Sequence, residues 1–315
     1  MQLAPIVAMR GPRQVGKTTI QHQLIEDLLK LRGVNASRIF RIQFDDVPLL
    51  GSYRQPILAL EQWCEKNVLR EPLNAVADRN EPVYLFFDEV QNLKSWAPQV
   101  KSLVDNSAAK TLITGSSALR IASGRDSLAG RISMIELGPL RLGEIAGVRR
   151  LGTLPPFHPT GEIEAWTKKD FWLDLARYAD RHGKILRRAF DAFCQFGGYP
   201  RGHQPGATRS ELAGSVIDLV VKRTLGHDLR AGVGGRTRDR SIVEETFRRV
   251  CRYAGQAVRP KFISDEVAQV LGAGVREQAV RDAIAFLADA MLVHEVQPLE
   301  ALTKRQSHPP KLCLC

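Results

Sequence analysis

Apolar runs alternate with amphipathic stretches along the first half of the chain. Short apolar runs such as YLFF and TLIT end in polar residues, whereas TTIQHQLIEDLLKLRG repeats its apolar positions with helical spacing. Near-continuous apolar strands are typical of a parallel sheet covered by helices on both faces. The pattern therefore predicts an α/β fold with a doubly wound parallel sheet and a helix between consecutive strands. The expected strands are APIVAMRG, SRIFRIQF, PVYLFFDEV, KTLITGSS and ISMIELGPL.

The pattern changes after residue 145, which we take as the end of a first domain, residues 1–145. The next stretch contains VRRLGTLPPFHP, whose prolines and glycines favour turns and extended backbone, so we expect a linker over 146–164. Residues 165–240 show helical periodicity without strand-like runs. We expect this segment to form a helical lid.

Residues 241–315 are expected to form three short helices followed by a pair of strands. The helices are expected in SIVEETFRRVCRYAG, ISDEVAQVLG and VREQAVRDAIAFLADA, and the strands in MLVHEVQPLE and PPKLCLC. Ser264 is the expected N-cap of the second helix, and Gly272 is its expected end. Three helices followed by a hairpin is the order of a winged helix-turn-helix domain.

The composition of the 315-residue chain narrows the choice of compartment and partner. No stretch approaches the roughly 20 apolar residues of a membrane span, and no basic region precedes the short apolar run at the start. We therefore expect a cytoplasmic protein with no membrane partner. The five cysteines are mostly scattered, as is typical of reduced thiols. The formal net charge of +11 favours a polyanionic partner such as DNA, and the alternative is a solvated basic surface.

A glycine-rich segment joins the first expected strand to the first expected helix. It matches the pattern G-x-x-x-x-G-K-[ST]. In such a loop, backbone N–H groups surround the β-phosphate, the lysine reaches the β and γ oxygens, and the hydroxyl ligates Mg²⁺. The segment predicts a site for ATP and Mg²⁺ made by Gly11, Pro12, Arg13, Gln14, Val15, Gly16, Lys17, Thr18 and Thr19.

Two carboxylates end the strand YLFF about seventy residues downstream. Asp88 is expected to hold Mg²⁺ together with Thr18, and Glu89 to orient and polarise the water that attacks the γ-phosphate. The alternative is a solvated acidic turn, which the pairing with the glycine-rich loop makes less attractive. A general-base candidate next to a metal carboxylate favours hydrolysis over simple retention of the nucleotide.

Three further residues are weaker candidates for this site. Ser116 and Ser117 follow the strand TLIT and are candidate sensors of the γ-phosphate, although a simple turn accounts for them equally well. Arg131 ends SLAGR just before the strand ISMIEL, where it could act on the γ-phosphate of a neighbouring subunit. The alternative is a surface arginine, and Arg125 is a competing candidate.

The third helix of the expected winged helix-turn-helix domain carries candidate DNA contacts. Its apolar positions Val280, Ile284, Phe286 and Leu287 are expected to face the core. Polar side chains at its start and basic ones in the expected wing suit base edges and phosphates. The alternative is a scaffold that packs on the first domain with a solvated basic face, since acidic residues dilute the patch. The candidates are Arg276, Gln278, Arg281, Lys304 and Arg305.

Taken together, these segments resemble the AAA-type P-loop ATPases of bacteria and archaea that are known only as ATP-binding proteins. The resemblance rests on GPRQVGKTT, FFDEVQNLKSW, ITGSS, SLAGR, PLRLGE and FGGYP. It implies Walker A roles for Lys17 and Thr18, Walker B roles for Asp88 and Glu89, a sensor 1 role for Ser116 or Ser117, and an arginine finger at Arg131. Arg201 is a weaker sensor 2 candidate. The group also implies an additional domain of unknown function after the winged helix, so we expect a truncated chain here.

The resulting hypothesis is an ATPase that drives a conformational switch of the winged-helix domain on or near DNA. Its rival is a non-hydrolysing nucleotide sensor or DNA-binding regulator. A small-molecule phosphotransferase fits less well, because the Asp-Glu pair and the winged helix suit an ATPase better. GTP is disfavoured because no N-K-x-D-like base reader is present. A homo-oligomer or partner protein is expected only if Arg131 acts on a neighbouring subunit.

Overall fold

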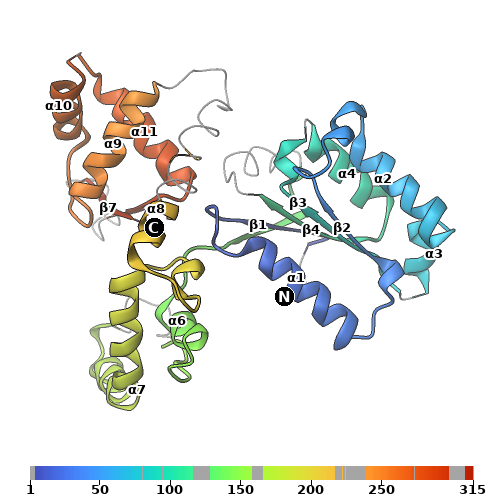
Figure 1. Ribbon diagram of the computed structural model, residues 1–315, viewed down its shortest axis with the longest axis horizontal. Helices are drawn as coiled ribbons and strands as arrows, with labels where there is room; N and C mark the ends of the chain where they lie inside the picture. Colours follow the sequence, from blue (N-terminus) through green and yellow to red (C-terminus); the bar gives the residue numbers. More distant parts are fainter. Residues whose placement is uncertain are drawn as a thin grey trace. The chain divides into compact units, whose positions relative to one another are not determined.

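The computed structural model divides the chain into two compact units, residues 1–138 with 221–315, and residues 139–220. Figure 1 shows the elements of each unit. Within the part of the chain that the structure describes, no helix combines the length and apolar character that a membrane span requires. The described residues are 4–79, 81–93, 95–115, 128–157, 166–216, 222, 224, 239–272, 274–297 and 309–314.

A five-stranded parallel sheet forms the core of the first unit, with strand order β2-β3-β4-β1-β5. All five strands fall in the segments that the apolar pattern predicted, so the α/β prediction is confirmed. The strands are β1 (Ile6–Arg10), β2 (Ile39–Gln43), β3 (Tyr84–Asp88), β4 (Lys110–Gly115) and β5 (Ile132–Glu136).

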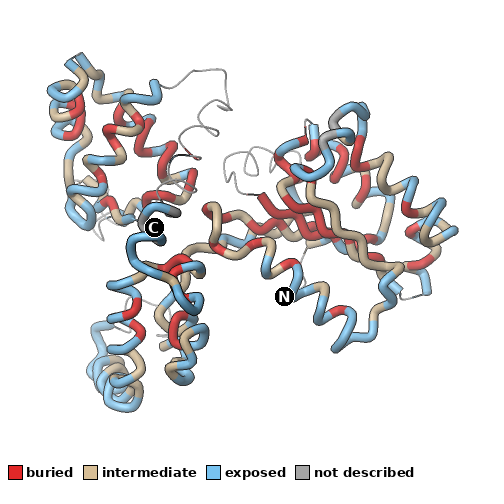
Figure 2. Tube along the Cα trace, in the orientation of Figure 1, coloured by how far each residue is buried: buried red, intermediate tan, exposed pale blue. Residues whose placement is uncertain are grey.

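Helices cover both faces of this sheet, as the near-continuous apolar strands require. On one face, Met9, Phe86 and Leu112 pack with Leu28 of helix α1. On the other, Phe87 and its neighbours pack with side chains of α2 and α4 (Figures 1 and 2). Each fully buried side chain of this size contributes about 1.5–3 kcal/mol relative to an exposed one. The helices are α1 (Lys17–Lys30), α2 (Pro56–Cys64), α3 (Leu73–Asp78) and α4 (Trp96–Asn106).

The amphipathic stretch between β2 and β3 is interrupted and does not form one continuous helix. After α2 the chain makes a π-helical turn, η3 (Glu65–Leu69), and then takes the left-handed conformation at Arg70, with φ of 60°. Pro72 precedes α3 and disfavours helical backbone at the residue before it. The helix expected between β4 and β5 lies largely outside the described residues. The short 3₁₀ helices are η1 (Ala36–Arg38), η2 (Pro48–Ser52), η4 (Val90–Asn92) and η7 (Pro200–His203).

The second unit is helical and contains α6 (Leu142–Val148), α7 (Lys169–Phe196) and α8 (Arg209–Val216). Ile145 and Ala146 of α6 pack against Ala189 and Ala192 of α7. The unit starts at residue 139, so α6 groups with the helical segment although it overlaps the end of the expected core domain.

Two motifs of the sequence, PLRLGE and FGGYP, meet within this helical unit. Leu140 N donates a hydrogen bond of 2.6 Å to Gly198 O. A Cβ on Gly198 would lie 2.7 Å from the Cβ of Pro139, so the close approach requires glycine. Arg201, the sensor 2 candidate, follows in η7 and is exposed.

The C-terminal segment contains three helices and an antiparallel strand pair in the expected order. The four apolar positions expected to face the core, Val280, Ile284, Phe286 and Leu287, are all buried. The second helix begins at Pro260 and not after Ser264, whose buried hydroxyl donates to Lys261 O inside the helix, so the N-cap prediction was wrong. Its end at Gly272, with φ of 65°, is confirmed. The elements are α9 (Arg240–Arg252), α10 (Pro260–Leu271), α11 (Glu277–Asp289), β6 (Val293–Val296) and β7 (Lys311–Leu314).

Candidate nucleotide-binding site

The glycine-rich loop leaves the carboxyl end of β1 and opens α1. Because all five strands are parallel, the ends of β3 and β4 lie at the same edge of the sheet as this loop. Only glycine fits at Gly11, where a Cβ would lie 2.2 Å from Leu137 O. Gly16 and Gln14 both have left-handed backbone, with φ of 99° and 66°. The loop is therefore a tightly constrained turn that ends in the first N–H groups of a helix.

Lys17 is buried at the start of α1, with only 6 % of its surface exposed. Its Nζ donates hydrogen bonds to the loop carbonyls of Gly11 at 2.9 Å and Pro12 at 2.8 Å. The pKa of Lys17 is lowered to about 8, mainly by burial; the charges of Glu89 and Asp88 oppose this shift, and the charge of Arg13 adds to it. The ammonium is thus held inside the loop that a phosphate would enter.

Asp88 ends β3 and is almost fully buried, with an exposure of 1 %. Its Oδ2 accepts a hydrogen bond of 2.9 Å from Thr18 Oγ1, and its Oδ1 accepts a short one from Thr114 Oγ1. Thr114 lies near the carboxyl end of β4. The two sequence motifs therefore meet in space, as a shared magnesium and nucleotide site requires.

This polar cluster also contains three side chains that lie outside both sequence motifs, those of Arg41, Gln43 and Gln21. Arg41 Nη2 on β2 donates to Asp88 Oδ2 at 3.0 Å and to Gln43 Oε1 at 2.9 Å. Gln21 on α1 is fully buried, accepts from Arg41 Nε at 3.3 Å and donates to Thr114 Oγ1 at 3.1 Å. The signal in the sequence was the alternation of polar Arg41 and Gln43 in the apolar strand IFRIQ, which points both side chains to the same face.

Glu89 follows Asp88 in the left-handed region, with φ of 53°. This conformation is uncommon for a residue other than glycine and turns the chain sharply at the end of β3. Glu89 Oε2 accepts a short hydrogen bond from Gln91 Nε2. The neighbouring carboxylates are therefore held differently, Asp88 inside the buried cluster and Glu89 on the turn beyond it.

The remaining candidates for this site lie elsewhere or outside the described residues. Ser116 and Ser117 are not among the described residues. Arg131 precedes the amino end of β5, and Ile6 N donates to its carbonyl. The loop follows the carboxyl end of β1, about 16 Å away at the usual rise of a strand, so Arg131 does not reach the loop of its own chain. Its guanidinium pairs with Asp105.

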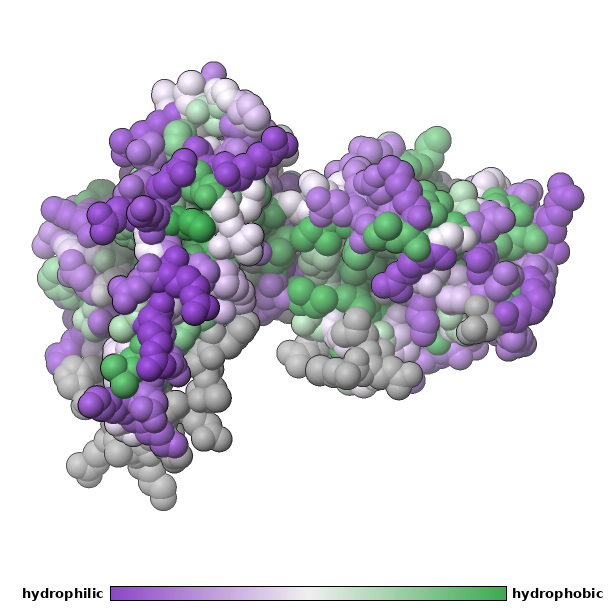
Figure 3. All heavy atoms as spheres, turned by 90° about the horizontal axis from the view of Figure 1, so that it is seen from below, coloured by the Kyte–Doolittle hydropathy of each residue, from purple (hydrophilic) through white to green (hydrophobic). Residues whose placement is uncertain are grey.

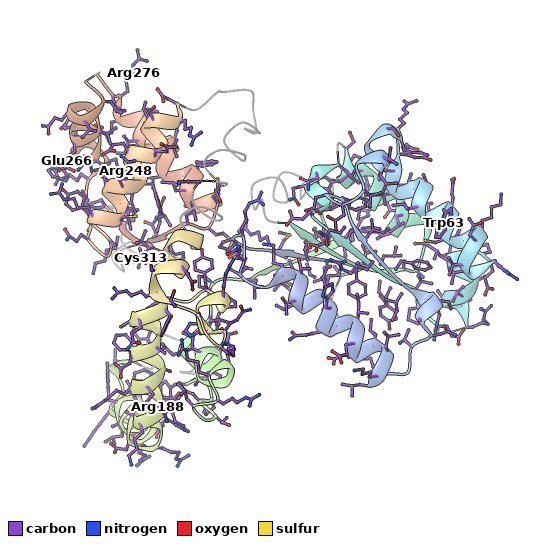
Figure 4. All side chains as sticks on the ribbon, viewed as in Figure 1. Trp63, Arg188, Arg248, Glu266, Arg276 and Cys313 are labelled. Atoms are coloured by element: carbon purple, nitrogen blue, oxygen red, sulfur yellow. The ribbon has the colours of Figure 1, made fainter. Side chains whose placement is uncertain are left out.

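The DNA candidates on α11 are exposed, but two of them already have acidic or polar partners. Arg281 pairs with Glu277, and Gln278 Nε2 donates to Asp282 Oδ1 at 2.9 Å. Arg276 is the N-cap residue of α11 and lies at the periphery of this segment in Figure 4. No ion pair of Arg276 is found within the described part of the chain. Lys304 and Arg305 lie outside the described residues.

Basic residues near the end of α9, the first helix of this segment, are also neutralised in part. Arg248 and Arg249 both pair with Glu245, and Arg249 Nε lies 3.6 Å from Glu266 Oε2. On the face seen in Figure 3, hydrophilic residues are mixed with hydrophobic patches. The positive formal charge is therefore only partly available to a polyanion, since acidic partners lie next to several arginines.

Comparison with known families agrees with the geometry of the sheet and loop. Residues 4–146 match the model of the AAA domain family, and residues 187–315 match a domain of unknown function (DUF8612). Each match covers less than half of the chain. The parallel sheet, the glycine-rich loop and the first match define an α/β P-loop NTPase fold of the AAA type. No curated protein matches the chain.

Solved structures that the chain resembles distantly include two proteins of Aeropyrum pernix and one of C. elegans. The Aeropyrum pernix ORC2 protein, in ADPNP–ADP complexes, is 12% identical with a TM-score of 0.47, over 98% of this chain and 83% of its own. The Aeropyrum pernix ORC1 protein in complex with DNA is 13% identical with a TM-score of 0.32, over 98% and 82%. PCH-2 of C. elegans is 13% identical with a TM-score of 0.34, over 70% and 61%.

Proposed function

We propose that this chain binds ATP with Mg²⁺ in the glycine-rich loop and hydrolyses it. The observation that supports the proposal most directly is the contact of 2.9 Å between the Thr18 hydroxyl and the Asp88 carboxylate. Hydroxyl and carboxylate oxygens are the ligand types that Mg²⁺ prefers, so these residues fit the ion. When bound, the ion would neutralise charge that develops on the phosphates.

The chain's own residues supply the rest of the site. Lys17 brings a buried cation to the loop, and the first N–H groups of α1 favour an anion. Glu89 stands next to the metal carboxylate and is the candidate that orients water and takes its proton. These roles distinguish a hydrolase from a protein that only retains the nucleotide.

Two variants separate hydrolysis from binding. Lys17→Ala is expected to abolish ATP binding, whereas Glu89→Gln is expected to bind ATP normally and to hydrolyse it about 10²- to 10⁴-fold more slowly. Binding is followed with a fluorescent ATP analogue and turnover by phosphate release. Equal hydrolysis by Glu89→Gln and the parent would remove Glu89 from the mechanism. Binding without turnover in the parent would favour the rival function, a nucleotide sensor.

The second part of the proposal concerns the output of the site. We propose that the C-terminal segment is a winged helix-turn-helix domain that contacts duplex DNA, and that ATP binding and hydrolysis switch its position. The order of α9, α10, α11, β6 and β7 supports this assignment, as does the exposed Arg276 at the start of α11. Phosphate release measured with and without duplex DNA tests the link between the two parts.

A further inference from the structure

A partly buried ion pair, Arg41 with Asp88, lies inside the polar cluster that includes the proposed metal ligands Thr18 and Asp88. The Asp88 side chain is 2 % exposed and that of Arg41 is 25 % exposed. Arg41 Nη2 and Thr18 Oγ1 both donate to the same oxygen, Asp88 Oδ2. Neither the glycine-rich loop nor the acidic pair contains Arg41, which comes from the middle of β2.

A carboxylate this deeply buried requires compensation of its charge. Lys17 is nearby, but its hydrogen bonds go to Gly11 O and Pro12 O. Among the described residues, Arg41 is the cation that forms a salt bridge with Asp88. Its guanidinium therefore holds the charge and the orientation of the carboxylate that the proposed function assigns to Mg²⁺.

Arg41 also has other acceptors close at hand. Gln43 Oε1 accepts from the same nitrogen at 2.9 Å, and Gln21 Oε1 accepts from Nε at 3.3 Å. These neutral amides can keep the guanidinium hydrogen-bonded after its contact with Asp88 is lost. Replacing Arg41 by Mg²⁺ at Asp88 then needs only a small movement of the Arg41 side chain.

We propose that Arg41 is the internal counter-cation of Asp88 and opposes binding of a divalent cation to this carboxylate. In the absence of nucleotide, Arg41 satisfies Asp88 and keeps its affinity for Mg²⁺ low, because two cations near one carboxylate repel each other. The phosphates of ATP add negative charge and further metal ligands, which favour Mg²⁺ binding over the contact between Arg41 and Asp88. Arg41 would thereby make metal binding dependent on nucleotide. The inference rests on the proposed function for the assignment of Asp88 to Mg²⁺ and for the identity of the nucleotide.

The test measures Mg²⁺ binding to the full chain without nucleotide. In EDTA, Arg41→Gln is expected to unfold at a lower temperature than the parent, because Asp88 loses its counter-cation. Its affinity for Mg²⁺ should rise roughly tenfold, so that Mg²⁺ raises its unfolding temperature more than that of the parent. Adding Asp88→Asn to Arg41→Gln should abolish the extra Mg²⁺ response. Arg38→Gln is the matched control, since Arg38 faces Glu81 at 3.9 Å and no contact with Asp88 is found.

A second substitution separates charge from hydrogen-bond geometry. Arg41→Lys keeps the positive charge but not the fork of donors, so its Mg²⁺ response should stay close to that of the parent. Equal Mg²⁺ responses in the parent and Arg41→Gln, or a response of Arg41→Lys equal to that of Arg41→Gln, would overturn the proposal and leave Arg41 a structural hydrogen-bond donor. ATP binding by the parent is measured separately. Its absence would reject the proposed function without changing the Mg²⁺ comparison.

Discussion

Thr18 Oγ1 lies 2.9 Å from Asp88 Oδ2, although the two residues are 70 positions apart in the sequence. The contact joins the first turn of α1 to the end of β3, across the edge of the sheet where β4 also ends. Parallel strands bring their carboxyl ends to one edge, which is why a hydroxyl and a carboxylate so distant in sequence share a hydrogen bond.

Thr18→Val should weaken ATP binding in the presence of Mg²⁺ by about tenfold or more, because it removes a metal ligand and a donor to buried Asp88. In EDTA, the effect on ATP binding should be much smaller. Titration with a fluorescent ATP analogue, with and without Mg²⁺, measures both effects. Thr18→Ser keeps the hydroxyl and serves as the control. An equal loss in both conditions would point to a distorted loop and not to a lost metal ligand.

The affinity for ATP should decline above about pH 8. Burial lowers the pKa of Lys17 to about 8, and the phosphates require the protonated form, so the affinity is constant below this pH. Above it the loss approaches tenfold per pH unit, since the unliganded protein releases a proton that binding must restore. Titrations from neutral pH to about pH 10 check the trend. The exposed Lys30, which pairs with Glu26, provides Lys30→Ala as a control with an unchanged profile. A flat profile for the parent would contradict the role given to Lys17.

The strands and both nucleotide motifs were predictable because each depends on local sequence. Apolar runs such as YLFF specify buried strands, and the glycine-rich loop carries its own backbone requirements. The polar cluster around Asp88, in which Arg41 and Thr114 donate to the carboxylate and Gln21 donates to Thr114, could not be predicted in the same way. Arg41, Gln21 and Thr114 come from β2, α1 and β4, and only the strand order and the packing of α1 on the sheet bring them together.

Local signals also misplaced one boundary. Ser264 followed by Asp265 and Glu266 is a typical helix start, yet α10 already begins at Pro260. Proline at the first helical position fixes φ and needs no N–H partner, so the earlier start is favoured. Packing then buries Ser264 inside the helix.

Gly11→Ala should destabilise the first unit by about 1–3 kcal/mol and impair ATP binding. The added Cβ would lie 2.2 Å from Leu137 O. The backbone of Leu137 is itself fixed by the hydrogen bond from Leu137 N to Arg10 O, so the loop or the end of β5 must shift. Chemical unfolding and ATP titration measure the two losses. Gly138→Ala is the neighbouring control, because its Cβ would meet no atom within 4 Å. Similar behaviour of the two variants would contradict the steric explanation.

The helical unit should lose stability as the pH falls below the ordinary pKa of histidine. Burial lowers the pKa of His203 from 6.5, Arg149 lowers it further, and the hydrogen bond to Gly197 O opposes the shift. Arg149 Nε donates to His203 Nδ1 at 2.7 Å, so the native state favours the neutral ring. The unfolded chain then binds more protons than the native one, and the free energy of unfolding falls as the pH drops through about 6.5.

This dependence is measured by unfolding the parent and His203→Gln at neutral and mildly acidic pH. Glutamine keeps a donor for Gly197 O and does not titrate, so the variant should lose part of the acid sensitivity. His22→Gln, at an exposed position of α1, should retain it. Identical pH profiles for the parent and His203→Gln would exclude His203 as the source.

Arg276→Gln should weaken binding to duplex DNA more than Arg281→Gln does. Both residues are exposed near the start of α11, but Arg281 is already paired with Glu277, and its contact with a phosphate must first disrupt that pair. Arg276 is the N-cap residue and has no such ion pair within the described residues, so it can neutralise a phosphate directly. Its loss should reduce the slope of log affinity against log salt by about one. Fluorescence anisotropy with a labelled duplex at several salt concentrations measures the slope for the parent and for both variants. Equal slopes in all three proteins, or no DNA binding by the parent at low salt, would show that α11 makes no phosphate contact through Arg276.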